Sequence, residues 1–110
     1  MNQSKPSDVN NQAILNLLDE TVELAESMLA PPTPRSLACK IGDELIPSLY
    51  EARSYVEIGY IGALEVRLGV LNASIIASKL VDMDPSFAPL HSRIRVLQEE
   101  ASQAARKENQ

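Results

Sequence analysis

The stretch YVEIGYIGALEVRLGVLNASIIA, residues 55–77, decides the fold, because nearly every residue in it is apolar, small or weakly polar. Only Glu57, Glu65 and Arg67 carry charge in it. A segment of this composition cannot lie on a surface without leaving a large apolar patch in water, which a monomeric protein rarely does. The stretch is therefore expected to form either the central layer of a helical core or a surface for a partner.

This stretch is too interrupted to cross a bilayer. Its longest uncharged run covers residues 68–78, and a spanning helix needs roughly 20 apolar residues. A buried charge at the bilayer centre would also be costly, at about 2.5–3.5 kcal/mol. No membrane span is therefore expected.

Length and charge exclude several classes of function. The 110 residues suffice for one domain with a modest core. A formal net charge of −5 argues against a nucleic-acid partner, which would need a basic face, and against an anionic membrane surface. The single cysteine, Cys39, excludes a disulfide framework within the chain. With no signal-peptide pattern in residues 1–12, these features make a cytoplasmic protein the expectation.

The N-terminal part of the chain predicts a disordered segment followed by a long helix. Residues 1–7 are polar and show no periodicity. Ser7 or Asp8 is placed to cap a helix that runs to about Ala30. Its opposite face is acidic and has no basic residue to balance it, so it is either a solvated surface or a surface that steers a basic partner. Steps of three and four place its apolar residues and one threonine on one stripe: Ile14, Leu15, Leu18, Thr21, Val22, Ala25, Met28 and Leu29.

Three prolines separate this helix from the next one. Pro31, Pro32 and Pro34 push the residues before them out of the helical region, so residues 30–33 are expected to form a stiff, extended connection. A second helix is predicted from Pro34 to about Ile46. Its buried residues are expected to be Leu37, Ala38, Ile41 and Leu45.

Pro47 is ambiguous, because the apolar pattern continues through it. Proline inside a helix costs about 3 kcal/mol, which favours a break or sharp kink; a continuous helix is the alternative. With a break, a third helix covers residues 48–68, and Gly69 ends it in the left-handed conformation. Asn72 then caps a short fourth helix over residues 73–83.

The C-terminal part of the chain predicts one further helix. Asp84 and Pro85 end the preceding helix, and Ser86 is placed to cap a last helix that runs to about Arg106. Residues 8–106 thus form a single helical domain, with residues 107–110 frayed. No strand pattern is present, so the fold class is all-α, with four to five helices in TPR-like hairpins or a compact bundle. The last helix has a heptad-like seam formed by Phe87, Leu90, Ile94, Leu97, Ala101 and Ala104.

The sequence contains no catalytic signature. His91 is the single histidine and has no carboxylate or cysteine at metal-ligand spacing. Glu57 and Glu65 lie in one helical row, but the Glu-x-x-His partner of a carboxylate metal site is missing, and each is expected to reach solvent or to pair with arginines such as Arg53 or Arg67. Phosphate loops and hydrolase motifs are also missing. We therefore expect no enzyme activity, no cofactor and no metal.

The second half of the chain resembles a known helical family. LEVRLG at 64–69, VLNAS at 70–74, Ala77, Leu80 and MDPSF at 83–87 resemble a tetratricopeptide (TPR) unit, in which glycine ends the first helix and alanines let the second pack closely. More specifically, these residues resemble the TPR-like co-chaperones of type III secretion needle subunits. The resemblance implies a small cytoplasmic chaperone that holds an apolar helix of its client and works with a second small helical chaperone.

The sequence therefore predicts a protein-binding module whose client is an apolar or amphipathic helix. The alternative is a homodimeric bundle closed by the seams of the first and last helices. Gly59 and Ala63 are one helical turn apart, a spacing that allows close approach of another helix, either in the core or in a partner's groove. The residues expected to bind the partner are Gly59, Tyr60, Ala63, Leu64 and Leu68.

Overall fold

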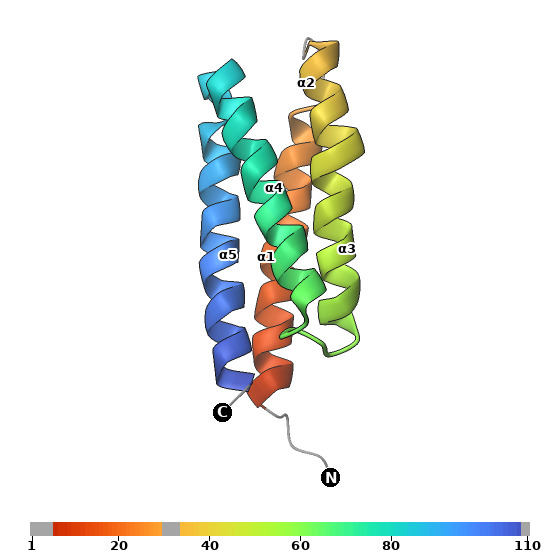
Figure 1. Ribbon diagram of the computed structural model, residues 1–110, viewed down its shortest axis with the longest axis vertical. Helices are drawn as coiled ribbons and strands as arrows, with labels where there is room; N and C mark the ends of the chain where they lie inside the picture. Colours follow the sequence, from red (N-terminus) through yellow and green to blue (C-terminus); the bar gives the residue numbers. More distant parts are fainter. Residues whose placement is uncertain (1–5, 30–33, 109–110) are drawn as a thin grey trace.

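The described residues form an antiparallel bundle of four helical rods. The computed structural model describes residues 6–29 and 34–108, and every regular element in these residues is helical. Each rod packs on the next along the chain, and the first also packs on the last, which closes the bundle (Figure 1). In chain order the elements are α1 (Pro6–Ser27), α2 (Arg35–Cys39), the π-helical segment η1 (Lys40–Leu45), α3 (Ile46–Glu57), α4 (Leu64–Met83), the short 3-10 turn η2 (Pro85–Phe87) and α5 (Ala88–Glu108).

The predicted all-α fold is confirmed, and of its two forms the compact bundle is the one observed. The ends of the helical domain lie further out than predicted. α1 begins at Pro6, because proline is well suited to the first helical position. α5 continues through residues 107–108. Basic residues in its last turn interact favourably with the partial negative charge at the C-terminal end of the helix. The predicted features of residues 1–5, 30–33 and 109–110 lie outside the described residues.

An aliphatic core fills the bundle, and the first and last helices bury in it apolar residues of the stripes predicted for them. In α1, Ile14, Leu18, Val22 and Ala25 are buried as predicted. Thr21 is buried with them, and its hydroxyl donates to the Leu17 carbonyl at 2.6 Å, so the polar group is satisfied. The whole predicted seam of the last helix is buried as well: Phe87, Leu90, Ile94, Leu97, Ala101 and Ala104.

The predicted break at Pro47 is wrong, because α2, η1 and α3 form one continuous rod. The Ile46 N–H donates to the Ile41 carbonyl, five residues back, instead of four. This wider turn shifts the hydrogen-bond register just before Pro47. A π-helical turn is one of the few ways in which a helix adapts to a residue such as proline. The Ser48 hydroxyl donates to the Glu44 carbonyl at 2.8 Å and supplies a further bond across the same turn.

The glycine that ends a helix is Gly59, not Gly69 as the sequence predicted. α3 ends at Glu57, and Gly59 has φ +95°, a conformation in which a side chain would be strained. Its N–H donates to the Val56 carbonyl at 3.0 Å, and the Tyr60 N–H donates to the Tyr55 carbonyl at 2.8 Å. These two bonds are those of a Schellman motif with glycine at its left-handed position. The predicted helix over 48–68 therefore stops early.

Gly69 instead lies inside α4, where it lets α4 approach α3 closely. A Cβ at this position would lie 2.9 Å from the Ser48 carbonyl oxygen and 3.2 Å from the Ala52 Cβ. The predicted cap Asn72 also lies inside α4 and donates from its side-chain amide to the Ser48 hydroxyl at 2.7 Å. The contact with α3 thus accounts for both residues, and α4 is one helix instead of two pieces.

Capping after α4 also differs from the prediction in one residue. The Asp84 carboxylate accepts from the Ser86 N–H at 3.0 Å, so Asp84, not Ser86, caps η2. Aspartate is among the preferred N-cap residues, and Pro85 then occupies the first position of η2, where its missing N–H is not needed. This cap sets the chain reversal from α4 into α5.

Ion pairs connect α1 to both neighbouring rods. Arg53 of α3 donates to Asp19 at 2.7 Å and to Glu57 at 2.9 Å, and Arg93 of α5 donates to Glu20 at 2.6 Å. The bonds to Asp19 and then to Glu57 raise the pKa of Arg53 above its ordinary value. The acidic face of α1 has no basic residue of its own, but Asp19 and Glu20 pair with arginines on the adjacent rods.

Replacing Arg53 tests how much these pairs contribute. Arg53→Gln is expected to lower the free energy of unfolding by about 1 kcal/mol or less at low salt, since the carboxylate partners are about half exposed. Thermal unfolding with and without added salt measures this, because screening should shrink the loss. The control is Arg35→Gln, an exposed arginine for which the described residues provide no ion pair. A loss that grows with salt would contradict the ionic interpretation.

Candidate protein-binding surface

α4 has two apolar faces, and one of them lies outside the core. The inner face carries the buried residues Val66, Gly69, Val70, Ala73, Ile76, Ala77 and Leu80. Steps of four, three and four place a second apolar row on the opposite side of the helix. We call this row the α4 stripe: Leu64, Leu68, Leu71 and Ile75, whose exposed fractions are 55, 52, 43 and 47%.

The turn between α3 and α4 extends the exposed apolar surface beyond the stripe. Ile58 and Tyr60 lie in this turn and are 66% and 61% exposed. Both residues lie in or next to the Schellman motif, before the chain enters α4 at Leu64. The end of the bundle at which α4 begins therefore presents apolar side chains to solvent.

The structure places the five predicted partner-binding residues at this end, although not on one helix. Tyr60, Leu64 and Leu68 are exposed, and Gly59 is exposed in the turn. Ala63 is half-buried, packs against the core and occupies the N-cap position of α4. The predicted close helix contact through Gly59 and Ala63 is therefore wrong, because neither lies inside a helix.

Sequence reasoning missed the second half of the stripe. Leu71 and Ile75 continue the row begun by Leu64 and Leu68, but the predicted interruption between residues 69 and 72 separated the two halves. The heptad-like spacing 64, 68, 71, 75 was the available signal. It is visible only if α4 is read as one helix.

A shallow apolar hollow runs along the α5 side of the stripe. Its volume is about 150 Å³, and Leu71 belongs both to it and to the stripe. On the other side of the stripe, Asn72 is bonded to α3. The hollow gives the surface a concave edge towards α5, lined by Arg67, Val70, Leu71, Gln98, Ala101 and Ser102.

The surface consists of apolar side chains bordered by Arg67. In residues 6–29 and 34–108, no group of three or more histidine, cysteine or acidic side chains could hold a metal ion. His91 is half-buried and Cys39 is an exposed free thiol. Glu57 pairs with Arg53, which is one of the two outcomes that the sequence left open for it. None of the described helices is long and apolar enough to span a bilayer.

Comparisons of the chain with models of known families, with curated proteins and with solved structures give no match. The surface is therefore interpreted from its own chemistry.

Proposed function

We propose that the protein is a helical adaptor or chaperone that docks an amphipathic helix of a protein client along the α4 stripe. The observation that carries this proposal is the exposure of four large apolar side chains at heptad-like spacing, on the side of α4 opposite the core. An apolar patch of this kind in water marks an interaction site. Helix-in-groove recognition uses such a row together with a neighbouring groove.

Several features of α4 support a helical occupant. The stripe is straight and follows a helix axis, so a second helix can lie along it with its own apolar residues between those of α4. The hollow next to Leu71 offers space for a side chain from that helix. Because the patch is confined to one helix face and one turn, we expect a modest interface and a transient complex.

The proposal of a specific client comes from the sequence resemblance. The sequence resemblance of residues 64–87 is the basis on which we propose a type III secretion needle subunit as client and a second small helical chaperone as co-partner, although residues 64–83 form one helix where a TPR unit has two. The exposed free thiol of Cys39 supports a reducing compartment, for which the cytoplasm is our proposal.

A homodimer is the alternative occupant of the same stripe. The seams of the first and last helices, which the sequence offered for dimerisation, pack against each other within one chain and are buried. The α4 stripe is then the apolar surface that a second copy would share with the client helix.

A library of displayed amphipathic helices, selected against the full chain, tests the proposal. We expect enrichment of helices with apolar residues at heptad spacing that bind with micromolar affinity. Leu68→Asp with Leu71→Asp should abolish this binding, because it places two charges in an apolar contact. Both residues are about half exposed, so the free energy of unfolding should fall by no more than about 1 kcal/mol.

The matched control is Val96→Asp, which charges an equally exposed apolar residue on α5 that is not in the stripe. This variant should bind like the parent. Failure to enrich any helix, or enrichment of helices that bind the double variant equally well, would overturn the proposal. A micromolar dimer in sedimentation that Leu68→Asp abolishes would assign the stripe to a second copy instead.

A further inference from the structure

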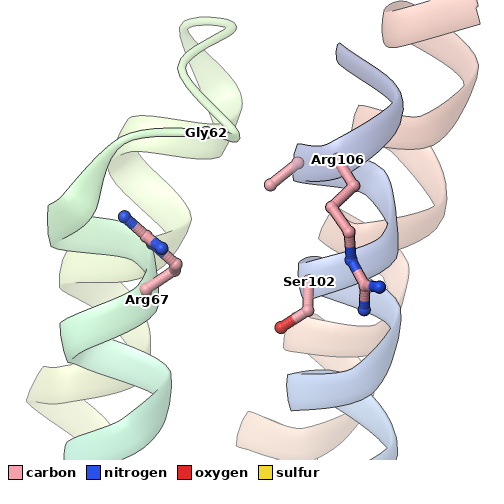
Figure 2. Close-up of a pocket in the computed structure, with 5 residues that line it drawn as sticks. Gly62, Arg67, Ser102 and Arg106 are labelled. Atoms are coloured by element: carbon pink, nitrogen blue, oxygen red, sulfur yellow. The ribbon is translucent and has the colours of Figure 1, made fainter. Parts of the chain in front are cut away.

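A second, larger hollow opens between α4 and α5, next to the start of the stripe. Its volume is about 380 Å³. Figure 2 shows Arg67 on the α4 side and Ser102 and Arg106 on the α5 side. It joins the apolar hollow, since both share Arg67 and Ser102. None of the described residues that line it is acidic: they are Gly62, Arg67, Ser102, Ala105 and Arg106.

The two arginines in this hollow differ from those that face α1. Arg53 and Arg93 each have a carboxylate partner on α1. Arg67 and Arg106 are exposed, and no ion pair joins either of them to a carboxylate in the part of the chain that the structure describes. Although the chain has a net charge of −5, its described residues provide no ion-pair partner for these two arginines on the two walls of one hollow.

We propose that these arginines bind carboxylate side chains along one edge of the docked client helix, so that the partner is an acidic amphipathic helix. This inference rests on the proposed function. Arg67 lies between the stripe and the hollow, so a helix on the stripe brings its α5-facing edge over both arginines. A guanidinium can hold a carboxylate through two parallel hydrogen bonds.

Charge complementarity favours such a client over a second copy of the chain. α4 contains no acidic residue between Glu65 and Asp82. A second copy laid along the stripe through its own α4 would thus offer Arg67 no carboxylate from the middle of that helix. An acidic client helix supplies the missing partner.

The position of the arginines also gives the contact a direction. Arg67 is one turn after the start of α4, and Arg106 is in the last turn of α5, at the same end of the bundle. The client's carboxylates are then required at this end, while only apolar contacts are needed towards Ile75. Charges placed in this way fix the orientation of a partner more than they raise its affinity.

The test uses the same displayed library with its flanking positions randomised, selected in parallel against the parent chain and against Arg67→Gln/Arg106→Gln. The parent should enrich helices with Asp or Glu on one flank, and the double variant should enrich the same apolar pattern without that preference. For one selected acidic helix, we expect about threefold weaker binding for each single variant and about tenfold for both at low salt. At about 1 M salt the difference should vanish.

The control is Arg35→Gln/Lys107→Gln, which removes the same charge from two exposed residues that line neither hollow. It should leave the acidic preference intact. Stripe-dependent helices with no flank preference, or an acidic preference that persists in Arg67→Gln/Arg106→Gln, would overturn this inference and leave the proposed function standing. Absence of any helix that requires Leu68 and Leu71 would overturn the proposed function itself.

Discussion

A chain that ends at Asp84 is expected to lose cooperative thermal unfolding and to become molten or insoluble. The truncation removes the buried residues Phe87, Leu90, Ile94 and Leu97, of which Phe87 belongs to η2, packed on α4, and the others to α5, packed on α1 and α4. At about 1.5–3 kcal/mol for each fully buried side chain, the loss is comparable to the whole stability of a small domain. Circular dichroism across a thermal scan measures it, and a sharp transition at the parent temperature would show that α5 is peripheral.

Substitutions at two neighbouring residues of α5 distinguish the stability lost with core packing from the effect of shortening the chain. Leu97 is fully buried, and Leu97→Ala should cost about 2–5 kcal/mol through cavity formation. Val96 is about half exposed, and Val96→Ala should change the free energy of unfolding by no more than about 0.5 kcal/mol. Equal losses for the two variants would contradict the orientation of α5.

Gly69→Ala is expected to destabilise the protein, although alanine is the better helix former. In an exposed helix this exchange would gain about 1 kcal/mol. At Gly69 the added Cβ would lie 2.9 Å from a backbone oxygen, the Ser48 carbonyl, so the two helices must separate. Overpacking of this kind costs about 1–3 kcal/mol, and the result should be a net loss in chemical denaturation.

Gly42→Ala is the matched control for this exchange. Nothing lies within 4 Å of the position that its Cβ would take, and its backbone is helical. We therefore expect an unchanged or slightly raised free energy of unfolding, by up to about 1 kcal/mol. Changes of opposite sign in the free energy of unfolding for Gly69→Ala and Gly42→Ala would establish that α3 and α4 approach closely. A gain in stability for both variants would refute it.

The first and last helices, α1 and α5, could be located from the sequence because each has a single apolar face. In α1 and α5 the apolar residues follow one stripe, so periodicity identifies both the helix and the side that is buried. Leu18 and Leu90 were predicted as core and are fully buried. The middle of the chain gave no such information, since α4 is apolar on two sides and its pattern fits more than one division into helices.

The glycines and Pro47 were misassigned for a related reason. A glycine that ends a helix and one that admits a neighbouring helix look alike in sequence. In the structure, the positive φ of Gly59 and the Ser48 carbonyl next to Gly69 distinguish them. The π-helical segment before Pro47 likewise has no local signal in the residues. In the candidate site, Leu64 and Leu68 could be predicted from the apolar sequence around them. The position of Arg67 and Arg106 in one hollow could not, because it depends on how α4 and α5 pack.

The two-sided character of α4 has a consequence for how the chain reaches its native state. A half-turn rotation of α4 would bury the four stripe residues and expose its inner face, so hydrophobic burial alone discriminates weakly between two arrangements. The discrimination comes from small side chains. Gly69 lies against the Ser48 carbonyl, and Ala73 and Ala77 are fully buried, so the leucines of the stripe would be overpacked at these positions. Early collapse is therefore expected to populate both facings of α4, with the rotated one as a kinetic trap that must reopen before the bundle closes.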